Sequence, residues 1–248
     1  MDSRFVIFAH PRTGSYNLVS LLNSADDIAC YGELFKPHWV ELDEKIKKAV
    51  GVETVEQRDA DHLGFLERLR AATPQALFGF KLFNYHLRRI PGVLEDLKSP
   101  RWKIVALVRD PIETYASTLR AQSTNIWTLK DGHPPPEERL LNAKVSFSRD
   151  TLEAFATYYN RFLDRIAAWR ELKGADVFTL YYNQVGHEPH MASLLDFLGS
   201  SASPASLQSE YRRQFGSELE KGFDNWESLL AYRETNWPFH ALPPASTM

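Results

Sequence analysis

A tight loop near the start of this chain carries the residue types that bind an anion. The apolar run Phe5–Ala9 is followed by His10-Pro11, the loop Arg12-Thr-Gly-Ser15 and then a helical pattern of apolar residues. A strand, a short loop and a helix N-terminus in this order aim backbone N–H groups and the positive end of the helix dipole at one point. Arg12 and the hydroxyls beside it add charge-assisted contacts. We therefore predict an anion site here, and a helix start with a serine cap and no ligand is the alternative.

The loop differs from the one that binds nucleoside triphosphates. That motif needs Gly, four residues and then Gly-Lys-Ser or Gly-Lys-Thr, and the chain contains neither tripeptide. The loop is also too short to wrap a β/γ-phosphate pair together with its magnesium. A single phosphate or sulfonate is the better fit.

A second basic residue follows the most apolar stretch of the chain. Residues 103–108 predict a buried strand, which ends at Arg109. Asp110-Pro111 then predicts a helix start, with Asp as the cap and Pro at the first helical position, and Ser117 lies on that helix. Because parallel sheets bind ligands beyond the carboxyl ends of their strands, we expect Arg109 to face a ligand. A surface salt bridge with Asp110 is the alternative.

The elements that must position these residues alternate between strands and helices. Strands are predicted over 4–9, 27–30, 77–83, 103–108 and 177–182, and helices over 15–24, 110–122, 148–172 and 189–198, with one or two amphipathic helices in 41–73. This alternation predicts a single α/β domain over 1–240, with a central parallel β-sheet flanked by helices. The last residues, 241–248, predict a frayed tail. The polar segment 123–149 predicts a lid, a binding loop or a partly disordered stretch.

Size and composition limit the class of protein to which this chain can belong. The 248 residues, 44% hydrophobic and 25% charged, fit an ordinary globular domain. A net charge of −3 gives no general attraction for nucleic acid, and no stretch approaches the ~20 apolar residues of a membrane span. The single cysteine, Cys30, excludes an internal disulfide and a cysteine-based zinc site. Cysteine usage this low fits a reducing cytoplasm, which we predict as the location, and the N-terminus shows no basic-then-apolar leader.

Two of these segments together resemble the sulfotransferase family, which uses the sulfuryl donor 3′-phosphoadenosine 5′-phosphosulfate (PAPS). Pro11-Arg-Thr-Gly-Ser15 resembles the family's 5′-phosphosulfate loop. Val108-Arg-Asp-Pro111, with Ser117 at the eighth position after Arg109, resembles its 3′-phosphate site. The resemblance implies the P-loop-like sulfotransferase fold, PAPS as cofactor, adenosine 3′,5′-bisphosphate (PAP) as product, and no metal.

Two later segments extend the resemblance with departures. Leu180-Tyr-Tyr-Asn-Gln-Val185 resembles the family's Tyr-Glu-Asp-Leu region, but Asn183 and Gln184 replace the two acids. Lys221-Gly222 resembles the loop that closes over the 3′-phosphate, with Glu220 where many relatives have Arg. The implied cofactor-binding residues are Arg12, Thr13, Gly14, Ser15, Tyr16, Asn17, Arg109, Ser117, Tyr182, Lys221 and Gly222.

The general base is implied by a further resemblance. The opening Pro-Arg-Thr-Gly and Tyr31-Gly-Glu-Leu-Phe35 resemble bacterial sulfotransferases of nodulation-factor and glycolipid type, in which a Glu after the second strand is the base; Glu33 matches it. A carboxylate there can take the proton that the acceptor loses as it attacks sulfur. Lys81 resembles the lysine that reaches the transferred sulfuryl group, and its apolar setting needs an anion partner. The rival bases are His10, His38 and His86.

The implied function is transfer of a sulfuryl group from PAPS to a small-molecule acceptor. A hydroxyl of a carbohydrate or secondary metabolite is expected, with an amine as the alternative, and 36–73 and 123–149 are the expected acceptor walls. No nucleic-acid partner is expected. Two other functions stay open: a small-molecule kinase that uses ATP and magnesium, and a non-catalytic nucleotide-binding protein, which Asn183 and Gln184 would permit.

Overall fold

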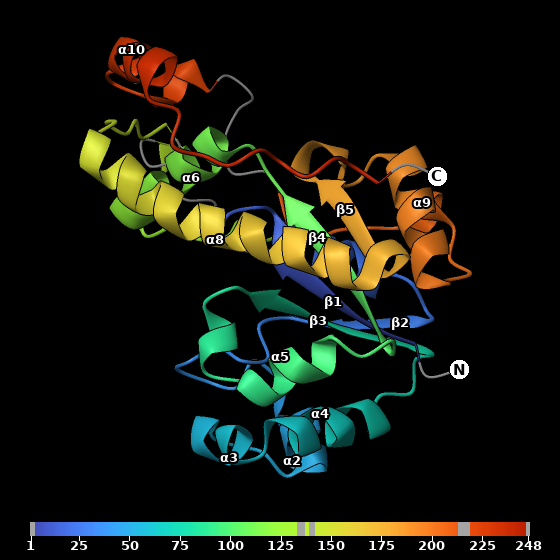
Figure 1. The fold of residues 1–248 in the computed structure, drawn as a ribbon. Helices are drawn as coiled ribbons and strands as arrows, with labels where there is room; N and C mark the ends of the chain where they lie inside the picture. Colours follow the sequence, from blue (N-terminus) through green and yellow to red (C-terminus); the bar gives the residue numbers. More distant parts are fainter. Residues whose placement is uncertain (1–2, 133–136, 139–141, 213–218, 247–248) are drawn as a thin grey trace.

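Five parallel strands form one sheet in the order β2-β3-β1-β4-β5 (Figure 1). The structure is a computed structural model, which describes residues 3–132, 137–138, 142–212 and 219–246. The strands are β1 Ser3–Ala9, β2 Ile28–Tyr31, β3 Leu77–Phe83, β4 Trp102–Val108 and β5 Val177–Tyr181. The predicted α/β fold with a central parallel sheet is confirmed.

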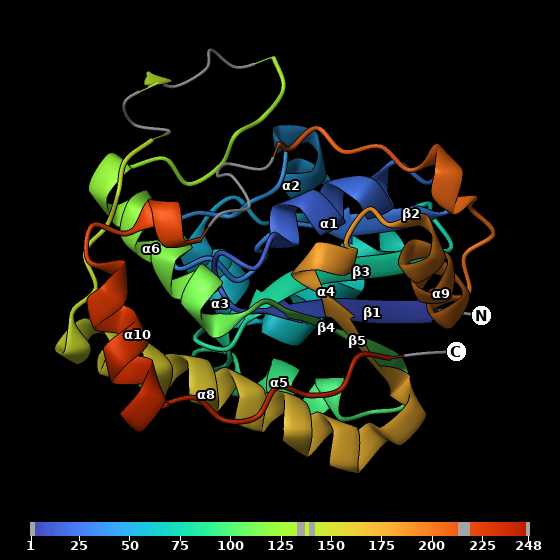
Figure 2. The same cartoon turned by 90° about the horizontal axis from the view of Figure 1, so that it is seen from above.

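Helices cover both faces of the sheet, which explains why its strands are apolar on both sides. On β1, Val6 and Phe8 belong to one buried cluster while Phe5 and Ile7 belong to the other, as expected when successive side chains point to opposite faces. One face is covered by α1 (Ser15–Asn23) and α9 (Glu188–Leu198), and the other by α4 (His62–Ala71), α5 (Pro91–Leu97), α6 (Pro111–Thr124) and α8 (Arg149–Lys173) (Figure 2).

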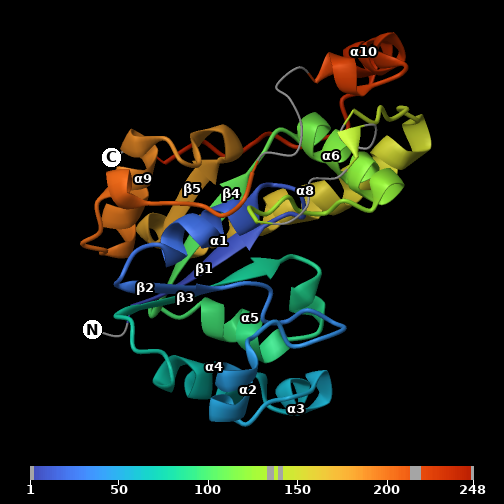
Figure 3. The same ribbon diagram turned by 180° about the vertical axis from the view of Figure 1, so that it is seen from behind.

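The helical region after β2 differs from its prediction. It forms three helices, α2 Glu44–Val50, α3 Val55–Ala60 and α4, which gather beside β2 and β3 (Figure 3). Two further helices, α5 and α10 (Trp226–Thr235), were not predicted. Both are short and bury few side chains, so their sequences carry no clear apolar stripe. Within the described ranges, no helix has the length and apolarity to cross a bilayer.

The start of α6 fixes the end of β4. The Asp110 side chain accepts hydrogen bonds from the backbone N–H groups of Ile112 and Glu113 at 2.9 and 3.0 Å, and Pro111 takes the first helical position. This is the predicted cap, and it satisfies N–H groups that a helix start leaves unpaired. Arg109 therefore stands between two well-defined elements.

The C-terminal residues cover the free edge of β5. The Ser246 N–H donates to the Thr179 carbonyl at 3.0 Å, and the Thr179 N–H donates to Ser246 Oγ at 2.8 Å. The Tyr181 hydroxyl donates to the Pro243 carbonyl at 2.6 Å. An edge strand exposes unpaired backbone groups, and these residues satisfy some of them. The frayed tail predicted for 241–248 is therefore wrong for residues 243–246.

Candidate active site

A cavity of about 970 Å³ lies at the carboxyl ends of the strands. Its walls come from the loop after β1, the turn after β2, the ends of β3 and β4, and the residue after β5. The sequence-predicted site residues in its lining are Arg12, Gly14, Ser15, Tyr16, Asn17, Glu33, Arg109, Ser117 and Tyr182. Parallel α/β sheets bind ligands at this edge. The tertiary structure thus brings the predicted anion loop, the Arg109 segment and Glu33 to one cavity.

The loop after β1 makes two left-handed turns. Arg12 has a φ of 72° and Gly14 a φ of 82°. The Thr13 N–H and hydroxyl both donate to the His10 carbonyl, at 3.3 and 2.8 Å, so this buried side chain is used to hold the loop together. Gly14, the N-cap residue of α1, makes no side-chain cap hydrogen bond, and Ser15, the first residue of the helix, lines the cavity. The loop therefore presents an uncapped helix N-terminus to the cavity, as an anion site requires.

Tyr182 joins this loop to the end of β4. A Cβ added to Gly14 would lie 2.6 Å from two ring atoms of Tyr182. The Arg109 guanidinium carbon lies 4.1 Å from the centroid of the same ring, and Arg109 Nη1 donates to the Arg12 carbonyl at 3.0 Å. The ends of β1, β4 and β5 are thereby held in one arrangement.

Replacement of Gly14 tests this close packing. We expect Gly14→Ala to lower the free energy of unfolding by about 1 kcal/mol more than Gly199→Ala does, because overpacking adds to the left-handed strain. Gly199 is the matched control: it has the same φ of 82° as Gly14, but an added Cβ there meets nothing within 4 Å. Thermal or denaturant unfolding of the two variants measures the difference, and equal losses would contradict the contact.

Arg12 and Arg109 lie close together beside Ser117. Arg12 Nε donates to Ser117 Oγ at 3.1 Å, and its Nη1 donates to the Trp127 carbonyl. Arg109 Nε donates to Glu113 Oε2 at 3.0 Å. Burial and the charge of Arg109 lower the pKa of Arg12 to about 10. Two like charges in a partly buried place are stabilised by an anion between them, which supports the predicted anion site.

Arg120 is a third arginine in this region, and it was not among the predicted site residues. It lies on α6 three residues after Ser117, and burial together with the charge of Arg109 lowers its pKa. Its guanidinium packs over Gly222, where an added Cβ would lie 1.4 Å from Nη2. The spacing of three residues was the signal available, since it places both side chains on one helix face.

Lys221 and Gly222 are not in the lining of the cavity. Gly222 is buried in the short turn Glu220–Gly222, and its carbonyl accepts from the Val145 N–H at 3.0 Å. Lys221 is exposed. Of this predicted pair, Gly222 approaches the arginine cluster through Arg120.

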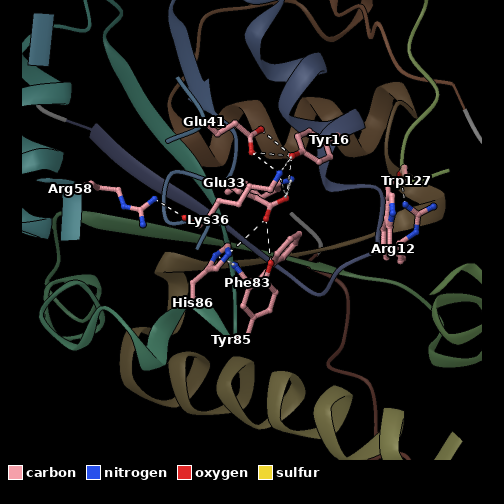
Figure 4. A network of polar contacts seen from close by, with 11 residues as sticks. Arg12, Tyr16, Glu33, Lys36, Glu41, Arg58, Phe83, Tyr85, His86 and Trp127 are labelled. Carbon is pink, nitrogen blue, oxygen red and sulfur yellow. Dashed lines mark hydrogen bonds and ion pairs between the residues drawn. The ribbon is translucent and has the colours of Figure 1, made fainter. Parts of the chain in front are cut away.

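Glu33 is the centre of a polar network (Figure 4). Its Oε1 lies 3.0 Å from Lys81 Nζ and accepts from the Tyr16 hydroxyl at 3.1 Å. Its Oε2 accepts from the Tyr85 hydroxyl at 3.3 Å and lies 3.7 Å from His86 Nε2. Burial raises the pKa of Glu33, but the charges of the neighbouring lysines outweigh burial and the pKa is lowered. Glu33 is therefore an ionised carboxylate that faces the cavity.

Lys81 lies behind Glu33. It is fully buried on β3, and its Nζ lies 3.0 Å from the centroid of the Tyr16 ring. Burial lowers the pKa of Lys81 to about 8, against the opposing effect of Glu33. Glu33 is the anion partner that the apolar sequence around Lys81 required. In this arrangement the Lys81 amine faces Glu33 and not the cavity, so it reaches no ligand there directly.

The three histidines weighed as bases have different surroundings. His10 packs against aromatic rings of α8, and burial lowers its pKa to about 4. His86 is fully buried, its Nδ1 accepts from the Phe83 N–H at 3.2 Å, and burial lowers its pKa to about 4. His38 is exposed and lines the cavity. Of the four residues considered, Glu33 and His38 can meet a ligand.

The predicted acceptor walls contribute only in part. The cavity lining from these segments is Lys36, His38, Trp39, Glu41, Trp127, Thr128 and Leu129. Helices α2 to α4, which make up most of 41–73, contribute no residue to this lining, and residues 133–136 and 139–141 of the second segment lie outside the described ranges. Among the described side chains, no group of three or more His, Cys, Asp or Glu is arranged to hold a metal ion.

A short ribbon closes one side of the cavity. Lys130 forms an antiparallel bridge with Tyr211, and the Arg212 N–H donates to the Leu129 carbonyl at 3.0 Å. Lys130 also pairs with Glu210 at 2.8 Å. Leu129, Tyr211 and Arg212 line the cavity. The segment predicted as a lid or binding loop thus gains its order from pairing with a distant part of the chain.

Comparisons with known proteins agree with this architecture. No protein-family model matches the chain. Nodulation protein H of Rhizobium tropici is 26% identical over 236 residues, which cover 91% of this chain and 87% of that protein. The sulfotransferase domain from the curacin biosynthetic pathway has a TM-score of 0.56 at 16% identity and covers 100% of this chain and 94% of that one. A sulfotransferase from Alicyclobacillus acidocaldarius has a TM-score of 0.50 at 15% identity, and the match covers 93% of this chain and 90% of that one. The chain therefore has the sulfotransferase fold.

Proposed function

We propose that this protein is a PAPS-dependent sulfotransferase, which transfers a sulfuryl group to a hydroxyl of a small-molecule acceptor. One observation carries the proposal: an ionised carboxylate, Glu33, shares a cavity with the anion loop and with Arg109. A sulfuryl donor with phosphates at two ends needs two cationic regions and a nearby base, and the cavity lining supplies residues for each.

The residues fit a doubly phosphorylated adenosine. Ser15, Asn17 and the uncapped N–H groups of α1 would hold the 5′-phosphate. Arg109 and Ser117 would hold the 3′-phosphate, and Arg12 connects the two regions through Ser117. The close approach of Gly14 to the Tyr182 ring supports a role for that ring beside the adenine. Lys221 is exposed, and its neighbour Gly222 packs against Arg120.

The reaction balances with Glu33 as the general base. When bound, PAPS supplies an activated sulfuryl group. Glu33 accepts the proton that the acceptor hydroxyl loses as its oxygen bonds to sulfur. Arg12 and the loop N–H groups would stabilise the charge that the 5′-phosphate gains as the leaving group when the sulfur–oxygen bond breaks.

The acceptor side of the cavity favours a ring-containing hydroxyl compound. Trp39, Tyr85 and Trp127 line this side, and each is about half exposed. Aromatic faces of this kind bind the flat faces of sugars and of polycyclic natural products. We infer that the acceptor group is a hydroxyl of a carbohydrate or secondary metabolite. The cytoplasmic location stays a prediction.

Ligand-induced stabilisation tests the proposal. We expect PAP at 100 times its Kd to raise the free energy of unfolding by about 2.7 kcal/mol, while ATP with magnesium has little effect. Thermal unfolding measures both. Stabilisation by ATP with magnesium but not by PAP would favour a kinase. PAP binding without transfer of labelled sulfuryl groups to any acceptor in a broad panel would favour a non-catalytic protein.

A further inference from the structure

Two lysines approach Glu33, and they differ in access to the cavity. Lys81 Nζ lies 3.0 Å from Glu33 Oε1 and its side chain is 0% exposed, whereas Lys36 Nζ lies 3.9 Å from the same oxygen and its side chain is 20% exposed. Lys36 lines the cavity and Lys81 does not. A ligand beside Glu33 therefore meets the amine of Lys36.

Lys36 is held by contacts that a ligand can replace. Its Nζ lies 3.1 Å from Glu41 Oε2 and donates weakly to the Tyr16 hydroxyl at 3.4 Å. It also lies 4.2 Å from the centroid of the Trp39 ring, which is 52% exposed. Ion pairs that water reaches contribute little to stability. Exchanging Glu41 for another anion as the partner of Lys36 therefore costs little free energy.

Hydrogen bonds hold the backbone at Lys36 in place, so its side chain can change partner while the backbone stays. The buried Arg58 donates from Nη1 to the Leu34 carbonyl at 2.9 Å and to the Lys36 carbonyl at 2.8 Å, and Figure 4 draws Arg58 beside Lys36. The Lys36 N–H donates to the Glu33 carbonyl at 3.0 Å. Glu33 can thus keep its position while the Lys36 amine changes partner.

The charges of this cluster show which of the two lysines can pair with an incoming anion. Glu33 and Glu41 are balanced by Lys36 and Lys81, so an incoming anion beside Glu33 adds an uncompensated negative charge. Lys81 cannot compensate it, because its departure would leave Glu33 buried without its closest cation. Lys36 can compensate it, because Glu41 lies where water reaches its side chain and shares the Tyr16 O–H with Glu33, at 3.0 and 3.1 Å.

We propose that Lys36 is the cation that contacts the sulfuryl group of PAPS, by exchanging Glu41 for a sulfuryl oxygen, while Lys81 stays on Glu33. This proposal rests on the proposed function. Lys36 would neutralise the sulfuryl oxygens as the acceptor oxygen bonds to sulfur, the bond to the 5′-phosphate breaks with its electron pair leaving on the phosphate, and Glu33 takes the acceptor proton. As the charge of Lys36 moves away from Glu33, the pKa of this carboxylate rises and it becomes a stronger base.

Binding of PAPS and PAP without acceptor tests the proposal, because the two ligands differ only by the sulfuryl group. Calorimetry on the full chain gives the ratio of their Kd values. We expect Lys36→Met to weaken PAPS relative to PAP by roughly 10-fold or more, the effect of one charge-assisted hydrogen bond, and Lys36→Arg to restore most of the ratio. Lys48→Met, at an exposed lysine on α2, is the matched control and should leave the ratio unchanged.

Lys81→Met decides between the two lysines. We expect it to leave the PAPS-to-PAP ratio unchanged, even though it destabilises the fold. A changed ratio in Lys81→Met, or an unchanged ratio in Lys36→Met, would overturn the proposal while PAP binding by the wild-type protein still supported the sulfotransferase function. Failure of the wild-type protein to bind either ligand would remove that function itself. If Lys81→Met does not fold, Lys36→Met and Lys36→Arg still give the answer.

Discussion

Glu33→Gln is expected to lower kcat by about 10²–10⁴-fold, with the affinity for PAP nearly unchanged. The amide has nearly the shape of the carboxylate and keeps one oxygen that can accept a hydrogen bond from Tyr16 or Tyr85, but it cannot take a proton from the acceptor. Transfer of labelled sulfuryl groups at saturating donor measures kcat, and calorimetry measures PAP binding. Full activity in this variant would move the role of base to His38, the histidine in the cavity lining.

The same substitution leaves Lys81 buried without its counter-ion, which provides a control. A buried charge that loses its partner destabilises a protein by about 3–5 kcal/mol. The double variant Glu33→Gln/Lys81→Met removes that charge, so we expect it to recover stability without recovering kcat. If both properties recover together, Glu33 acts only as a structural partner of Lys81.

The free energy of unfolding of the wild-type protein should depend on pH through the same ion pair between Glu33 and Lys81. Because the folded protein lowers the pKa of Glu33 below its ordinary value of 4.5, the ion pair stabilises the fold at pH values above that ordinary pKa. This contribution is lost as the pH falls through the lowered pKa. The loss should be absent in Glu33→Gln, and unfolding measured between neutral and acidic pH shows the difference.

Arg109→Ala is expected to weaken PAP by roughly 30- to 150-fold, the loss of a charge-assisted contact of about 2–3 kcal/mol. Adenosine 5′-monophosphate lacks the 3′-phosphate, so its affinity should change little. Calorimetry on both ligands measures the selectivity. Equal weakening of the two would remove Arg109 from the 3′-phosphate site.

A second substitution at this position separates charge from packing. Arg109 also donates to the Arg12 carbonyl and packs on the Tyr182 ring, so its removal could disturb the loop after β1. Arg109→Lys keeps the charge and loses the planar contact with the ring. We expect it to retain most of the preference for PAP, and a loss as large as that of Arg109→Ala would assign the residue to loop packing.

The local units of this protein could be predicted from short-range patterns in its sequence. The strand, loop and helix over 3–23 and the capped start of α6 follow from apolar periodicity, glycine, proline and an Asp cap, which act over a few residues. These units also placed Arg12 and Arg109 at strand ends. The short helices α5 and α10 escaped prediction because tertiary packing stabilises them more than their own sequences do.

Only the tertiary structure decided which distant residues meet. The buried lysine Lys81 required an anion, but its pairing with Glu33 depends on β2 lying next to β3 in the sheet. Other contacts also depend on how the chain folds. Arg120 approaches Gly222 from an element far away in the chain, and Lys36 lies between Glu33 and Glu41. Periodicity shows which face of an element is buried but not which element covers it. The order of the strands sets those neighbours, and so the composition of the cavity at their carboxyl ends.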